Sequence, residues 1–451
     1  MIEDDSRIGR GTGLNLEQVT DFRPIQYLGN KSRLLDLIED AVASVAAPDA
    51  RVCDLFAGTG VVARRLAMRR PVLASDIQEY SRVLTASLLE PSVDQNVLEK
   101  AMTSAMPRVA TGTGDLIEQE DLALDDALQG DPERLCEILE AGTILRHRDP
   151  AKSPDSSLGK RLRVAADAVP TGPGTVLLRY YGGLYFSFRQ AIELDALANA
   201  ARRVTGPSRD VALAAVIGTA SEVVSTVGNQ FAQPVQPRAK DGSIKHGLLK
   251  AVARKRRVSV TETFSRFVAR YANLEPASQG PHHVIRRDFR ELLSAPPLKI
   301  GVIYADPPYT RDHYSRFYHV LETVALGDEP TVSETGAAGA RTLSRALYRA
   351  DRHQSPFCIR TQAAGAFDAL FRGAHNIGAP VVLSYSPYSG GTVARPEPRV
   401  VTIECLAKLA GKYFSNVEVR AGGDVVHSRL NREELSRDID HGAEVLLVAS
   451  R

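Results

Sequence analysis

Cysteine, long apolar runs and net charge are all scarce in this 451-residue chain. Its four cysteines, Cys53, Cys136, Cys358 and Cys405, are far apart and form no Cys-x-x-Cys pair, which argues against a zinc site and a disulfide framework. No apolar stretch approaches the roughly 20 residues of a membrane-spanning helix, and the first residues lack the apolar core of a signal peptide. We therefore expect a cytoplasmic protein without membrane association or metal.

Short apolar runs alternate with helical periodicities, which predicts a parallel α/β sheet covered by helices on both faces. Residues 51–56 and 72–75 are predicted as buried strands on either side of a helix at 61–70, which makes a β-α-β unit. Further buried strands are expected at residues 300–305, 381–385 and 445–449. The long stretch between the first and second groups is mainly helical, and its residues 231–260 are polar and basic enough to predict an exposed loop or hairpin.

Two features of the first β-α-β unit suit a bound nucleotide-like ligand. The turn Asp54–Gly60 (DLFAGTG) follows a strand and precedes a helix, where glycines let the backbone approach a ligand. Such turns serve dinucleotides, phosphates and methyl donors alike, and some are only tight turns. Asp76 ends the next strand, where a carboxylate can accept hydrogen bonds from ribose hydroxyls or cap a helix.

The sharpest signal is Asp306–Tyr309 (DPPY), directly after the predicted strand at residues 300–305. Two prolines stiffen the chain and remove backbone donors, which leaves a carbonyl free beside a carboxylate and an aromatic ring. Asp306 and the carbonyl of Pro307 can each accept one hydrogen of an amine on a planar base, while Tyr309 stacks on the ring. We therefore predict Asp306, Pro307, Pro308 and Tyr309 as catalytic residues.

Charge is segregated along the chain although the net charge is only +2. Residues 115–140 contain ten acidic side chains and one basic side chain, and their role stays unassigned. Residues 238–257 contain eight basic side chains and one acidic side chain, and exposed lysine and arginine suit phosphate contacts. Beside a motif that handles a base, this segment predicts DNA binding through Arg238, Lys240, Lys245, Lys250, Arg254, Lys255, Arg256 and Arg257.

Together these segments resemble the Dam-like family of adenine-specific DNA methyltransferases, in which the cofactor motifs precede the DPPY motif. Residues 27–38 (YLGNKSRLLDLI) are similar to the family's first motif, although Asn30 stands between its glycine and lysine, and residues 286–293 (RRDFRELL) are similar to its acidic-phenylalanine motif. Residues 383–390 look like a later strand-and-loop element near the target pocket, and residues 211–237 are similar to the helix and loop that begin the family's target-recognition region. The resemblance implies that S-adenosylmethionine is bound by Tyr27, Gly29, Lys31, Asp54, Phe56, Gly58, Gly60, Asp76, Ile77, Asp288 and Phe289.

The composition and the order of the predicted elements, together with this resemblance, give a domain plan. Residues 1–20 would be a flexible tail, and residues 21–95 and 281–451 would form a Rossmann-like methyltransferase domain. Residues 96–280 would form a mainly helical inserted region that recognises the DNA target.

We accordingly expect site-specific transfer of a methyl group to the N6 amine of an adenine flipped out of double-stranded DNA. Methylation of the cytosine N4 amine, an RNA substrate, and a DNA-binding regulator on an inactive methyltransferase scaffold stay open as alternatives. A nicotinamide-dependent dehydrogenase would explain the glycine turn and Asp76, but it gives DPPY and the basic segment no role. Whether a cognate restriction or defence-system protein is a partner also stays open.

Overall fold

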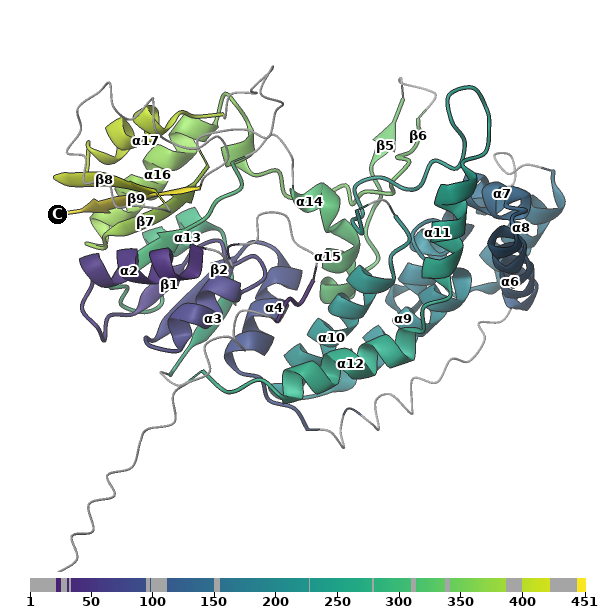
Figure 1. Cartoon of the computed structure of the whole chain (residues 1–451), viewed down its shortest axis with the longest axis horizontal. Coiled ribbons are helices and arrows are strands. Elements are labelled where there is room, and N and C mark those ends of the chain that lie inside the picture. The colour runs from purple at the N-terminus through teal and green to yellow at the C-terminus, as the bar shows by residue number, and fades with distance from the viewer. Residues whose placement is uncertain are drawn as a thin grey trace, which may run out of the picture.

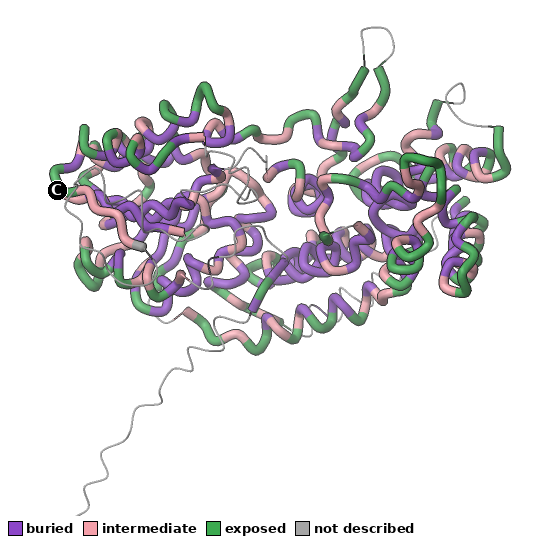
Figure 2. Tube along the Cα trace, turned by 45° about the horizontal axis from the view of Figure 1, so that its top comes forward, coloured by how far each residue is buried: buried purple, intermediate pink, exposed green. Residues whose placement is uncertain are grey.

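The structure is a computed structural model, and its ribbon forms a sheet lobe and a helical lobe that lie side by side (Figure 1). Figure 2 shows buried residues through the centre of both lobes and exposed residues along their outer helices and loops. The structure describes residues 22–25, 31, 34–94, 98, 112–149, 155–226, 228–277, 280–309, 314–336, 341–386, 400–421 and 444–451. The predicted tail at residues 1–20 therefore lies outside the described residues.

A seven-stranded sheet forms the centre of the sheet lobe. Its first five strands are mutually parallel, whereas the sixth in the order runs antiparallel to both of its neighbours. The strand order is β3 (His283–Arg286), β2 (Val72–Asp76), β1 (Val52–Asp54), β4 (Val302–Ala305), β7 (Val381–Tyr385), β9 (Val445–Ser450) and β8 (Asn416–Ala421).

Helices cover both faces of this sheet, which explains why its inner strands are apolar throughout. Successive side chains of a strand point to opposite faces, so Val52 of β1 joins one core and Cys53 joins the other. The core that contains Val52 lies under α2 (Leu35–Val45) and α3 (Val61–Ala67). The core that contains Cys53 lies under α13 (Phe289–Ser294), α16 (Ala363–Asn376) and α17 (Ile403–Ala410).

The helical lobe is built around α10 (Ser208–Val223), which is buried on nearly all sides. Its Gly218 allows a close approach, because a Cβ atom there would lie 2.7 Å from the ring of Phe267. Arg82 and Asp210 form an ion pair of 2.8 Å that joins α10 to α4 (Glu79–Leu89), the helix that follows β2. The helices of this part are α4 (Glu79–Leu89), α6 (Gly114–Gln129), α7 (Glu133–Ala141), α8 (Ser157–Ala168), α9 (Phe188–Arg203), α11 (His246–Arg256), α12 (Val260–Ala272), α14 (Tyr314–Phe317) and α15 (His319–Leu326).

The two lobes are joined by a shared apolar core and not only by a linker. Side chains of α4, which follows β2 in the sheet lobe, belong to the same apolar core as α10 and α12. Helix α15, which follows the DPPY turn, also packs into that core. The helical lobe therefore packs directly against the segments that follow β2 and β4.

Most predicted elements are confirmed, with one clear exception. The strands expected at residues 51–56, 72–75, 300–305, 381–385 and 445–449 contain β1, β2, β4, β7 and β9. The prediction of an exposed loop or hairpin over residues 231–260 is wrong for its second half, which forms α11 and the start of α12. In α11, Leu249, Val252 and Ala253 share one buried face, and this face of a short amphipathic helix outweighs the polar average of the segment. A separate hairpin of β5 (Glu334–Thr335) and β6 (Thr342–Leu343) projects from the molecule (Figure 1).

Candidate active site

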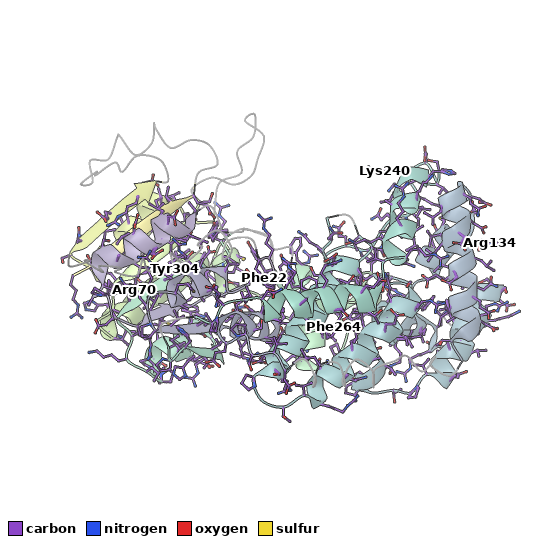
Figure 3. All side chains as sticks on the ribbon, turned by 60° about the horizontal axis from the view of Figure 1, so that its bottom comes forward. Phe22, Arg70, Arg134, Lys240, Phe264 and Tyr304 are labelled. Carbon is purple, nitrogen blue, oxygen red and sulfur yellow. The ribbon has the colours of Figure 1, made fainter. Side chains whose placement is uncertain are left out.

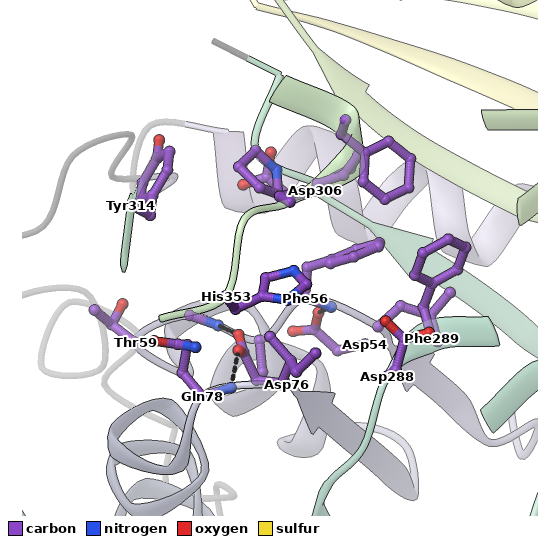
Figure 4. Close-up of a pocket in the computed structure, with 18 of the residues that line it drawn as sticks. Asp54, Phe56, Thr59, Asp76, Gln78, Asp288, Phe289, Asp306, Tyr314 and His353 are labelled. Atoms are coloured by element: carbon purple, nitrogen blue, oxygen red, sulfur yellow. Dashed lines mark hydrogen bonds between the residues drawn. The ribbon is translucent and has the colours of Figure 1, made fainter. Parts of the chain in front are cut away.

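The glycine turn and the DPPY turn meet at one pocket between the ends of two neighbouring strands. The first follows β1 and the second follows β4, and these strands are paired in parallel. From β1 the chain adds β2 and then β3 toward one edge of the sheet, and from β4 it adds β7 toward the other edge. Parallel α/β sheets bind ligands at such a reversal of strand order, beyond the carboxyl ends of the strands. Figure 4 shows Asp306 facing the side chains of Asp54 and Asp76 across this pocket. The space between the protein atoms here is about 1180 Å³, including solvent at its mouth.

The glycine turn has a conformation that depends on its glycines. Gly58 and Gly60 have positive φ angles of 54° and 79°. A Cβ atom on Gly60 would lie 2.8 Å from the Cα atom of Thr85, so no larger residue fits there without a shift. Gly60 caps α3, whose first amide groups consequently face the pocket region without a side chain over them.

Asp76 fastens this turn to the end of β2. Its Oδ2 atom accepts a hydrogen bond of 3.0 Å from the amide of Gly58, and its Oδ1 atom accepts one of 2.9 Å from the amide of Gln78 (Figure 4). Burial raises the pKa of Asp76, and the two amides act in the opposite direction. Each carboxylate oxygen can accept a second hydrogen bond, so both remain available to ligand hydroxyl groups. Asp76 is not the cap of α4, whose first amides instead bind Glu322.

One end of the pocket is apolar and aromatic. The ring of Phe56, from the glycine turn, lies 5.6 Å from the ring of Phe289 and 5.4 Å from that of Phe357. Asp288 stands beside them as the cap of α13, where its Oδ1 atom accepts the amide hydrogen of Arg290 at 2.8 Å. Ile77 also lines the pocket. This end can hold a flat heterocycle against aromatic rings with a carboxylate at its edge.

At the opposite side, Lys31 bridges two carboxylates. Its Nζ atom lies 2.9 Å from Oδ2 of Asp306 and 2.7 Å from Oε1 of Glu444. The hydroxyl of Tyr309 donates to the same Oε1 atom at 2.8 Å. The acid and the phenol of the DPPY turn are thereby held through one lysine and one glutamate, and Tyr385 packs against the Tyr309 ring at 4.8 Å between centroids.

The electrostatics of this cluster leave Asp306 ionised at neutral pH. Burial raises the pKa of Asp306 to about 6, while the Lys31 ammonium group pulls it down and Glu444 pushes it up. Burial disfavours the Lys31 charge, but Asp306 and Glu444 outweigh that effect and raise the pKa of Lys31. Burial raises the pKa of Asp54 to about 8, so this carboxyl group is largely protonated at pH 7. Of these two neighbouring acids, Asp306 is therefore the one that is mainly ionised at pH 7, and it is the stronger hydrogen-bond acceptor.

Further residues of the site were not predicted from the sequence. Tyr314, His353 and Phe357 line the pocket, and Glu444 contacts Lys31 and Tyr309. Glu444 directly precedes β9, and the pairing of Val445 with Tyr385 brings the start of this antiparallel strand to the edge where the parallel strands end. An acidic residue before an apolar strand was the available signal. Tyr314 begins the short helix α14, and His353 and Phe357 come from the segment between the β5–β6 hairpin and α16; neither stretch carries a recognisable spacing.

The described members of the predicted cofactor set line this pocket or shape its turn: Lys31, Asp54, Phe56, Gly58, Asp76, Ile77, Asp288 and Phe289 line it, and Gly60 closes the turn. So do all four residues of the DPPY turn. Tyr27 and Gly29 lie outside the described residues. Within the described ranges, no group of three or more His, Cys, Asp or Glu side chains is arranged to hold a metal ion. Nor does any helix in those ranges have the length and apolar character needed to cross a membrane.

The predicted DNA-binding segment is only partly available to a ligand. Arg256 is 3% exposed and forms a buried ion pair of 2.6 Å with Glu120, so its assignment as a phosphate contact is wrong. Arg257 pairs with Asp121 and Asp125, and Arg238 pairs with Glu133 and Glu140. The acidic and basic segments therefore neutralise each other inside the helical lobe.

The remaining basic side chains of this segment lie along the loop before α11 and on α11 itself. Lys240, Lys250 and Arg254 are exposed, and Lys245 and Lys255 are half-buried. Figure 3 shows Lys240 at the outer end of the helical lobe, far from the sheet. The Lys245 ammonium group donates to the carbonyl of Gln236 at 3.0 Å.

Comparison with known proteins gives two matches. Residues 27–111 match the profile of a family described as D12 class N6 adenine-specific DNA methyltransferase, and this range includes the glycine turn and Asp76. Over 370 residues the chain is 23% identical to the Type II methyltransferase M.NlaIII of Neisseria lactamica, an alignment that covers 78% of this chain and 80% of that protein. No solved structure matches the chain. An alignment that spans so much of the chain necessarily extends across the DPPY turn.

Proposed function

We infer that this chain is an N6 adenine-specific DNA methyltransferase of the D12 class, which transfers the methyl group of S-adenosylmethionine to the N6 amine of adenine in double-stranded DNA. The observation that carries this proposal is the meeting of the glycine turn and the DPPY turn at one pocket, across neighbouring strand ends. A dehydrogenase would need only the first of these turns.

The pocket residues fit S-adenosylmethionine. The Phe56, Phe289 and Phe357 rings and Asp288 suit its adenine, and the free acceptor sites of Asp76 suit its ribose hydroxyls. Asp54 and the glycine turn would lie next to its amino acid part and sulfonium, with Lys31 close by. When bound, this group supplies an electrophilic methyl carbon.

Asp306 and Pro307 would orient the amine of the target base. The lone pair of an aromatic amine is delocalised into the ring, so the amine is a weak nucleophile. If the Asp306 carboxylate and the Pro307 carbonyl each accept one amine hydrogen, the nitrogen becomes more pyramidal and its lone pair more localised. Catalysis then rests on positioning and on electrostatic complementarity to the developing positive charge. The Lys31 contact favours the ionised form of the Asp306 carboxylate, and Glu444 binds the same Lys31 ammonium group.

Tyr309 and Tyr314 would flank a base that has left the duplex. Enzymes that act on a base in duplex DNA extrude it into a pocket, where aromatic groups stack on it. The Tyr309 ring is 8% exposed and fixed through its hydroxyl, so it offers a rigid surface. Tyr314 begins α14, and Figure 4 shows its ring beside the Asp306 end of the pocket.

The helical lobe would recognise the DNA target. Lys240, Lys250 and Arg254 of the predicted segment are exposed, form no ion pair with a carboxylate among the described residues, and would contact phosphates. Arg256 is excluded from this role, and Arg238 and Arg257 are already neutralised by acidic partners.

The test is methylation of unmodified plasmid DNA by the purified protein with S-adenosylmethionine, followed by mass spectrometry of the nucleosides. We expect N6-methyladenine from the wild type and none from Asp306→Ala, with binding of S-adenosylmethionine retained in that variant. Detection of N4-methylcytosine instead would show that the methylated base is cytosine and not adenine. Near-normal turnover by Asp306→Ala would remove Asp306 from the mechanism.

A further inference from the structure

A second cavity adjoins the candidate active site on the side of the helical lobe. It is lined by Thr59 and Val61, which also line the first pocket, so the two cavities meet at the glycine turn. Figure 4 shows Thr59 on the side of the first pocket away from Asp288 and Phe289. The second cavity has about 1350 Å³ of space between protein atoms, including solvent at its opening. It therefore extends from the side where the target base, rather than the cofactor adenine, is expected.

Three basic side chains from three separate segments converge on this cavity. Arg23 comes from the described N-terminal segment, Lys255 from α11 and Arg270 from α12. Among the described residues, none of the three forms an ion pair with a carboxylate. This contrasts with Arg256 and Arg257, the residues that directly follow Lys255, which are both paired.

The geometry holds Arg270 in place without neutralising it. Its guanidinium group lies 4.6 Å from the centroid of the Phe22 ring and 5.5 Å from that of Phe267. Phe22 itself packs edge-on against Tyr271 at 4.8 Å, and Figure 3 shows it between the two lobes. Stacking on aromatic faces orients a guanidinium group and leaves its N–H donors free for an anion.

The other lining groups support an anionic ligand. Glu222 is the acidic residue on the wall, and its charge is taken up by an ion pair with Arg266. Ser221, Asn229 and Gln230 add hydroxyl and amide groups, which are common donors to phosphate oxygens. Asn229 has a φ angle of 51°, a left-handed conformation that non-glycine residues seldom adopt, at the wall of this cavity.

We propose that the cavity of Arg23, Lys255 and Arg270 binds backbone phosphates of the DNA strand that carries the target base, next to the flipped nucleotide. This inference rests on the proposed function. It places the main phosphate contacts at the junction of the two lobes and not at the outer end of the helical lobe. Anchoring the strand beside the glycine turn would hold the extruded base at the DPPY turn.

The experiment compares two triple variants with the same change in charge. Arg23→Gln/Lys255→Gln/Arg270→Gln removes the proposed contacts. Arg372→Gln/Lys408→Gln/Lys412→Gln removes three exposed basic groups from α16, α17 and the turn after α17, on the opposite face of the sheet from α3. Affinity for a 30-base-pair duplex is measured against salt concentration, because phosphate contacts do not depend on sequence.

Log affinity falls with log salt, and each lost phosphate contact makes this slope less steep by about 0.9. The affinity at 0.1 M salt then falls about eightfold, if the affinity at 1 M salt is unchanged. We expect the first triple variant to lose a slope of about two to three and the second to keep the wild-type slope. Arg270→Lys, which keeps the charge, should keep most of the slope, and thermal unfolding identifies any variant that fails to fold. Equal slopes for both triple variants, or an unchanged slope in the first, would overturn the proposal. A wild type that binds DNA without methylating it would refute the proposed function, while the slopes still decide the phosphate site.

Discussion

Lys31 and Glu444 should shift the pH dependence of methyl transfer in opposite directions. The ionised Asp306 carboxylate is the form that accepts an amine hydrogen, so activity should fall as pH drops through the pKa of this group, about 6. The Lys31 ammonium group, 2.9 Å away, favours the ionised form, and the Glu444 carboxylate disfavours it. Lys31→Met should therefore move the acidic limb of the rate profile to higher pH, and Glu444→Gln should move it to lower pH.

The size of the first shift follows from the contact distance. An opposite charge at this range lowers a carboxyl pKa by about 1 to 3 units, so Lys31→Met should place the Asp306 pKa at about 7 to 9. At pH 7 the ionised fraction then falls from about nine-tenths to between about one-half and one-hundredth. The methylation rate at pH 7 should drop by roughly two- to a hundredfold and recover as the pH is raised. Glu444→Gln should change the rate at pH 7 little through ionisation, because Asp306 is already mostly charged there.

The assay is single-turnover methylation of duplex DNA between pH 5 and 9.5, at saturating S-adenosylmethionine. Lys31 lines the cofactor pocket, so the dissociation constant of the cofactor is measured for each variant at each pH. Lys31→Arg keeps the charge and should keep the acidic limb near pH 6. The reasoning fails if Lys31→Met and wild type share one acidic limb, or if the two charge-removing variants shift it in the same direction.

The interior of the sheet was predictable because its strands are apolar on both faces. β1, β4 and β7 are buried throughout, and such runs between turn signals can be recognised without an alignment. The edge strand β3 has the burial pattern of a half-exposed segment, and its sequence, His283–Arg286, carries no apolar run. Edge strands are specified mainly by the neighbour they pair with, which a single sequence does not reveal.

The candidate site was predictable where local backbone chemistry sets it. The glycine turn and the DPPY turn are short motifs whose glycines and prolines act within a few residues. Glu444 reaches Tyr309 across 135 residues of sequence, through the antiparallel insertion of β9 into the sheet. That contact depends on strand order, so residue types and spacing alone could not predict it.

The sequence shows that charge is segregated along the chain, but it does not show which groups the charged segments contact. Two oppositely charged segments in one chain can bind a partner or each other, and α6 and α7 here neutralise much of the segment that contains α11. The basic groups without carboxylate partners at the junction of the lobes come partly from Arg23 and Arg270, which stand outside any basic run. Phosphate sites are built from convergent side chains, so local charge density alone is a weak guide to them.

Two stability measurements complete the test of these assignments. Gly60→Ala should lower the free energy of unfolding by more than Gly130→Ala, because both have positive φ angles but only Gly60 would clash, with Thr85; equal losses in urea denaturation would show that the turn can relax. Arg256→Met should cost about 3–5 kcal/mol, since it leaves Glu120 as an unpaired buried charge. The salt slope of DNA binding should not change in this variant at temperatures where it is folded, because the guanidinium group is buried and also donates to the carbonyl of Gly183. A variant with wild-type stability and a reduced slope would mean that Arg256 turns outward to contact phosphate, and the acidic segment would then be a competitor of DNA rather than a structural partner.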